Sequence, residues 1–212
     1  MDDRLYKLGG VSFVVSGGLF LAKSLLETLT GLPPAGGPEL VTWAVSRQAL
    51  IASTVEVFFF AVVFMIPATV ALYQSLAGSH RSSAVIGCGI IATTIPVLST
   101  LIIVQGRLVF PVFHIEVRSQ HVVELLVSLY HGGLHAVALL FVVATLVLSL
   151  AMRRRTYGPI ILPLGLATAA FDLIGAYPWA IGLVLWLVSG MLFSAWFILV
   201  GLSLYRTSTA PA

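Results

Sequence analysis

The most constraining feature of this sequence is a series of six long apolar runs, each close to the length that an α-helix needs to cross a lipid bilayer. The runs cover residues 8–29, 50–72, 85–104, 127–152, 160–177 and 180–204. A helix of about 20 apolar residues spans the roughly 30 Å of hydrocarbon in a membrane. The sequence therefore predicts an all-α bundle of six transmembrane helices, which takes up residues 1–212 as a single domain.

The composition excludes an ordinary soluble domain. Hydrophobic residues make up 59% of the chain and charged residues only 9%, whereas a soluble domain carries about 25% charged side chains. The formal net charge of +3 is too small to indicate a nucleic-acid partner. The lipid bilayer is the expected partner, and a second copy of the chain or a larger membrane complex is left open.

The positions of the basic residues predict the orientation. With the N-terminus in the cytoplasm, the segments on the inner side hold seven basic residues: Arg4, Lys7, Arg81, Arg153, Arg154, Arg155 and Arg206. The segments on the outer side hold three: Arg47, Arg107 and Arg118. Because cytoplasmic loops are enriched in Lys and Arg, we expect a multi-pass protein of the cell (inner) membrane with both termini in the cytoplasm.

The connections and the small residues give further expectations. Residues 31–38 contain three prolines and three glycines, which break helical structure, so we expect a loop there. Residues 106–120 form a longer connection that we place at the membrane interface. Gly10 and Gly17 lie on one face of the first helix, and small residues at such spacing favour close packing of helices.

Several ionisable side chains fall inside the apolar runs at one common depth. Lys23 lies 16 residues from Lys7, and Glu56 lies 17 residues from Tyr73. His135 and Asp172 each lie 17 residues from the cytoplasmic end of their own run. At 1.5 Å per residue, all four are about 24 to 26 Å from the inner edge of the membrane. Glu27 and His131 lie one helical turn further out than Lys23 and His135.

Two interpretations of this polar layer remain open. Ionisable residues within a membrane are costly and usually mark a functional site. In the functional interpretation, Lys23, Glu56, His131, His135 and Asp172 line an outward-facing pocket for a small solute or a proton. Lys23 is then neutralised by Glu56 or Asp172, and Glu27 and Glu124 form the rim. In the structural interpretation, the same residues are ion pairs close to the interface.

A metal site is a further alternative. Glu124, His131 and His135 lie within about 20° of one face of a helix, and two histidines four residues apart can share a divalent ion. Glu124 is nevertheless about 16 Å from His135 along the helix axis, so a second helix would have to complete the ligand set. We predict no cofactor, and His131 and His135 remain weak candidates for a metal-assisted membrane enzyme.

Two helix ends resemble a known family. The sequences are Pro67-Ala-Thr-Val-Ala-Leu-Tyr73-Gln-Ser-Leu76 and Ala195-Trp196-Phe-Ile-Leu-Val-Gly201-Leu-Ser-Leu-Tyr205-Arg206. They are similar to a family of uncharacterised bacterial and archaeal six-helix membrane proteins, the domain of unknown function 4386 type. The resemblance implies a fold and a membrane location, and it supplies no catalytic residue. An accessory subunit of a membrane complex therefore stays a third possibility beside the solute pocket and the enzyme.

Overall fold

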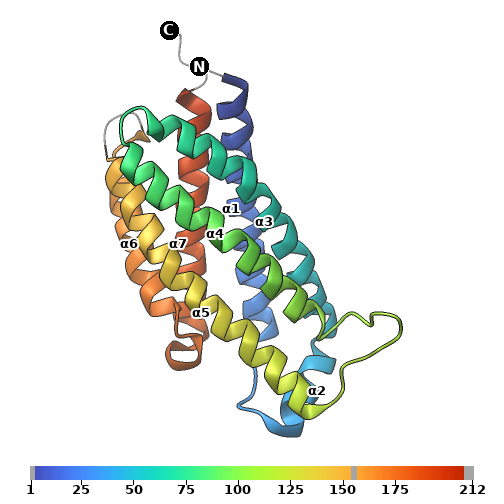
Figure 1. The fold of residues 1–212 in the computed structure, drawn as a ribbon. Coiled ribbons are helices and arrows are strands. Elements are labelled where there is room, and N and C mark those ends of the chain that lie inside the picture. The colour runs from blue at the N-terminus through green and yellow to red at the C-terminus, as the bar shows by residue number, and fades with distance from the viewer. Residues whose placement is uncertain (1–2, 154–156, 208–212) are drawn as a thin grey trace.

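The protein is an all-helical bundle in the computed structural model, which describes residues 3–153 and 157–207 (Figure 1). The helices are α1 (Asp3–Thr30), α2 (Gly37–Ser46), α3 (Gln48–Ala77), α4 (Arg81–Gly106), α5 (Gln120–Ala151), α6 (Ile161–Gly175) and α7 (Pro178–Thr207). These described residues contain no β-strand. The predicted all-α class is confirmed.

Each of the six predicted apolar runs lies in one helix, but the helices differ in length. Within the described residues, α1, α3, α4, α5 and α7 are long and apolar enough to cross a membrane. The run at 160–177 is shorter than predicted, because α6 has 15 residues and a length of about 22 Å. The fold is thus that of a multi-pass membrane protein, and the sixth crossing stays a prediction.

Six of the helices form a closed ring. α1 packs between α3 and α7, α4 packs between α3 and α5, and α6 packs between α5 and α7. The start of α1 and the end of α7 lie at the same end of the bundle (Figure 1). This arrangement creates an interior that is bounded by all six helices, and the ionisable residues must lie either inside this ring or on its outer face.

Close packing of α1 against α7 depends on small residues, as the sequence indicates. A Cβ atom on Gly10 would lie 2.8 Å from the carbonyl oxygen of Gly201, and one on Gly17 would lie 2.9 Å from that of Ser194. Real side chains do not approach backbone atoms so closely. The two helix backbones can therefore touch only where glycine is present.

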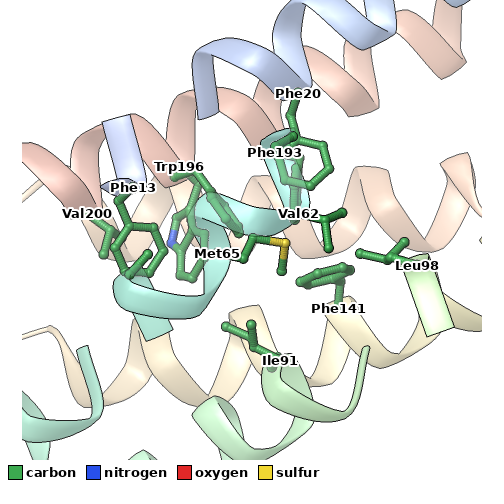
Figure 2. Packing of buried hydrophobic residues seen from close by; sticks show 14 of the residues in the cluster. Phe13, Phe20, Val62, Met65, Ile91, Leu98, Phe141, Phe193, Trp196 and Val200 are labelled. Carbon is green, nitrogen blue, oxygen red and sulfur yellow. The ribbon is translucent and has the colours of Figure 1, made fainter. Parts of the chain in front are cut away.

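Aromatic side chains fill one half of the interior (Figure 2). Phe13, Met65, Trp196 and Phe197 are fully buried there. The Trp196 indole N–H donates to Ser149 Oγ at 3.0 Å, which satisfies the one polar atom of that side chain. This half of the bundle, toward the start of α1 and the end of α7, is packed without a polar layer.

The opposite end of the bundle carries a short helix that the sequence pattern does not predict. Residues 31–36 form the expected loop, and α2 then begins with Pro38 in its first turn, where the missing N–H is tolerated. Leu40 and Ala44 of α2 pack on the α5 side chains Val123 and Val127. With 10 residues, α2 covers the end of the bundle and does not cross it.

The turn between α6 and α7 stops short of the end of the bundle that carries α2 (Figure 1). α7 is interrupted near its start by Gly182, whose φ of 74° is a conformation that favours glycine. The short α6 and this early break leave space above the turn. The interior is consequently less covered on this side than at the aromatic half.

Candidate functional site

A cavity of about 130 Å³ occupies the interior of the helix ring between the aromatic half and the α6–α7 turn. Four phenylalanines form its base, one each from α1, α3, α5 and α7: Phe20, Phe58, Phe141 and Phe193. Their rings follow one another with centroids 6.0 Å apart for Phe58 and Phe20, 5.2 Å for Phe20 and Phe193, and 4.9 Å for Phe193 and Phe141. We call these four residues the aromatic floor. Figure 2 shows Phe20, Phe141 and Phe193 directed into the same interior.

Lys23 and Glu27 form a buried ion pair on the wall of this cavity. Lys23 Nζ donates to Glu27 Oε2 at 2.7 Å, and both residues are less than a tenth exposed. Lys23 Nζ also lies 4.7 Å from the centre of the Phe58 ring, a distance at which a cation is attracted to an aromatic face. The positive charge is thus compensated within α1 and on the aromatic floor.

Tyr130 extends this pair across the interior to α5. Its hydroxyl donates to Glu27 Oε1 at 2.8 Å, and the side chain is only 2% exposed. Both carboxylate oxygens of Glu27 therefore have a donor, which is the condition for a charge to be stable away from water. The chain Lys23–Glu27–Tyr130 connects two helices that do not pack against each other in the ring.

Asp172 of α6 is the second buried carboxylate of the cavity, and it is only partly satisfied. Ser189 of α7 donates to Asp172 Oδ1 at 2.9 Å. Asp172 Oδ2 is buried without a hydrogen-bond partner among the described residues, and the whole residue is 7% exposed. A buried polar atom without a partner is unusual and calls for an explanation, such as a ligand, an ion or water.

The two histidines of α5 lie in different places. His135 lines the cavity, and its Nδ1 lies 2.8 Å from the carbonyl oxygen of Ala176 at the end of α6. Since a carbonyl oxygen can only accept, Nδ1 carries the hydrogen and Nε2 is left as an acceptor. His131 is outside the cavity, with Nδ1 at 2.9 Å from the carbonyl oxygen of Val127 on its own helix.

Glu56 is the prediction that the structure corrects. Its side chain is exposed on the outer face of α3 and does not line the cavity. The predicted pairing of Lys23 with Glu56 or Asp172 is wrong, because Lys23 pairs with Glu27. A shared depth brought Glu56 into the predicted layer, but depth says nothing about the face of the helix. Glu27 lies four residues after Lys23 and therefore on the same face of α1.

Glu124 has a structural contact at the bundle end. Its Oε1 accepts hydrogen bonds from the backbone N–H of Gly37 at 2.8 Å and from Gln120 Nε2 at 3.0 Å, so it fixes the start of α2. Within the described residues, no three His, Cys, Asp or Glu side chains are arranged to hold a metal ion. The predicted face of Glu124, His131 and His135 is thus divided among separate contacts. Metal analysis of the purified protein would test the metal hypothesis directly.

Two further hollows adjoin the cavity on the side of α2. A wide one is lined by the loop at 32–35, by Glu124 and His131 of α5, and by Pro178, which also lines the cavity. A small one is lined by Glu27, Tyr130 and His131 together with Gln105 of α4. Glu27 therefore borders both the cavity and the small hollow. The polar side chains form a continuous lining from the cavity toward the end of the bundle that carries α2.

Sequence reasoning missed Tyr130, Ser189 and the aromatic floor. Tyr130 directly precedes His131, so a search for buried hydroxyl donors on the polar helices could have found it. Ser189 and the phenylalanines carry no signal of their own, because serine and phenylalanine are ordinary residues of membrane helices. Only their convergence in three dimensions indicates a site.

Comparisons of this chain with protein-family models, with curated proteins and with solved structures find no match. The resemblance of the ends of α3 and α7 to a known family stays a prediction. The function of the protein must therefore be inferred from the geometry and chemistry of the cavity.

Proposed function

We propose that the protein binds a small solute in the cavity beside Lys23, Glu27 and Asp172, and that it carries this solute into or across the membrane. The observation that supports this most strongly is the shared location of the buried ionisable side chains. Lys23, Glu27, His135 and Asp172 come from three helices and line one cavity. Ionisable residues inside a membrane are rare, face the interior of bundles and typically belong to substrate or proton pathways.

The positions of the basic residues support an orientation in which the cavity opens to the outside. Among the described residues, Arg4, Lys7, Arg81, Arg153 and Arg206 belong to the end where α1 starts and α7 ends. Arg47, Arg107 and Arg118 belong to the opposite end. Arg154 and Arg155 lie outside the described residues. By the positive-inside rule, the end with α2 and the adjoining hollows faces away from the cytoplasm.

The aromatic floor gives this orientation a functional meaning. It separates the cavity from the cytoplasmic half, where the core is tightly packed. A solute that enters past the α6–α7 turn would stop at the floor, next to the ion pair and Asp172. Transport beyond this point requires the floor to open, whereas a binding protein needs only the outward path.

Thiol labelling tests the proposal. Cys88 is the only cysteine of the chain, so Cys88→Ala gives a background without thiols. In this background, Ala138→Cys places a thiol on the α5 wall of the cavity, and Ala144→Cys places one on the same helix in the packed core. We expect a small membrane-impermeant thiol reagent, added from outside, to modify position 138 and not position 144. Equal protection of both thiols would contradict an outward-accessible cavity.

A second candidate function is that of a subunit in a membrane complex, and Glu56 favours it. This exposed carboxylate lies on α3 among exposed apolar side chains such as Phe59, Phe60 and Val63. A carboxylate facing lipid is unfavourable, and a polar group on a partner helix would relieve that cost. We expect Glu56→Leu to reduce the size of the particle extracted in mild detergent. An unchanged size would leave Glu56 as a side chain that reaches toward the headgroups.

A further inference from the structure

The proposed function leaves the class of solute open, and the charge balance of the cavity narrows it. Lys23 and Glu27 compensate each other at 2.7 Å. Asp172 has no cationic partner within the described residues, and its Oδ2 has no donor there. The cavity therefore holds one uncompensated carboxylate. Resting on the proposed function, we propose that the solute is a small organic ammonium ion that binds to Asp172.

The acceptors around Asp172 match an ammonium group. Asp172 Oδ2 lacks a hydrogen-bond donor, and the tautomer of His135 leaves Nε2 as an acceptor on the lining of the same cavity. A primary ammonium group has three N–H donors and no acceptor. It supplies the missing donor to the carboxylate and neutralises it, which a neutral or anionic solute cannot do. Charge-assisted hydrogen bonds of this kind are about twice as strong as neutral ones.

The aromatic floor matches the rest of such a solute. Faces and edges of Phe20, Phe58, Phe141 and Phe193 border the cavity, and Trp186 of α7 adds a fifth aromatic side chain. Aromatic faces attract cations as well as apolar groups. Lys23 Nζ over the Phe58 ring shows this contact within the protein itself. The floor thus favours a cation with a compact apolar body over a strongly hydrated inorganic ion.

The size of the cavity limits the solute. Its volume of about 130 Å³ is close to that of an engineered protein cavity of about 150 Å³ that binds benzene. A cyclic or branched amine of this size fits without displacing the floor. An anion of the same size has to compete with Glu27 for Lys23, since Lys23 Nζ already contacts both Glu27 and the Phe58 ring.

Calorimetric titration of the purified full chain in detergent at neutral pH tests the inference with three probes of similar size. Cyclopentylamine is a cation, cyclopentanol is neutral and butyrate is an anion. We expect cyclopentylamine to bind about tenfold more tightly than cyclopentanol, because it makes a charge-assisted contact that the alcohol lacks. Asp172→Asn should remove this preference while cyclopentanol still binds, which shows that the variant is folded. Glu56→Gln, which removes an exposed carboxylate from the outer face of α3, should keep the preference.

The other outcomes separate this inference from the proposed function. Equal affinity for amine and alcohol, or a preference for the amine that persists in Asp172→Asn, overturns the ammonium inference and leaves a solute cavity in place. Tightest binding of butyrate overturns it in favour of an anion at Lys23. Failure of all three probes to bind overturns the inference and counts against the solute cavity as well.

Discussion

Lys23 Nζ and Glu27 Oε2 lie 2.7 Å apart on one face of α1, and both side chains are buried in the interior of the helix ring. The pair places a full positive and a full negative charge where water is scarce. Such a pair is stable only as a unit, because either charge alone is left without compensation. This relationship determines how the cavity responds to substitution.

Removal of one partner should be more harmful than removal of both. We expect Lys23→Met or Glu27→Gln alone to lower the free energy of unfolding by about 3 kcal/mol, since each leaves a buried charge unpaired. The double variant should recover most of this loss. Thermal unfolding of the detergent-purified protein measures the effect, with Glu56→Gln as a control on an exposed carboxylate. A double variant as unstable as the sum of the two single ones would contradict the pairing.

Tyr130 should be required for the stability of the same pair. Tyr130→Phe removes the hydroxyl that donates to Glu27 Oε1 at 2.8 Å and leaves a buried carboxylate oxygen without a donor. We expect a loss of about 1 to 3 kcal/mol in the free energy of unfolding. Tyr177→Phe is the matched control, because that side chain is 41% exposed. If both variants are equally stable, the hydroxyl of Tyr130 does not support Glu27.

Adjacent glycines of α1 should differ sharply in their tolerance of alanine. A Cβ on Gly17 would lie 2.8 Å from Ile198 Cγ1 and 2.9 Å from the Ser194 carbonyl oxygen, whereas a Cβ on Gly18 meets nothing within 4 Å. We expect Gly17→Ala to destabilise the protein by about 1 to 3 kcal/mol, because α1 and α7 must separate. Gly18→Ala should be neutral or slightly stabilising. Equal effects in the same unfolding assay would place the α1–α7 contact elsewhere.

The fold was predictable because a membrane helix is encoded by a local and redundant signal. Each of the six apolar runs corresponds to one helix, and the loop at 31–36 follows from its prolines and glycines. The short helix α2 was not predictable from this signal, because its 10 residues are too few to span a membrane. The length of α6 was overestimated for a related reason, since apolar residues continue past the end of the helix.

The site was predictable only in part. Residue counting placed Lys23, His135 and Asp172 at one depth, and the structure brings these three to one cavity. It could not say which way a side chain points, which is why Glu56 was included although it lies on the outer face of α3. Glu27 was assigned to the rim, although it is the direct partner of Lys23. Position along a helix gives depth, but the partner of a charge depends on rotation and packing.

The most direct test of the cavity as an accessible, negatively charged site compares the reaction of one thiol with two reagents. In the Cys88→Ala background, Ala138→Cys is treated with a cationic and an anionic methanethiosulfonate of similar size, and the rates are corrected for their reactivity with a free thiol in solution. We predict that the cationic reagent reacts about tenfold faster, and that Asp172→Asn removes this difference. Equal corrected rates, or a faster anionic reagent, would contradict the account.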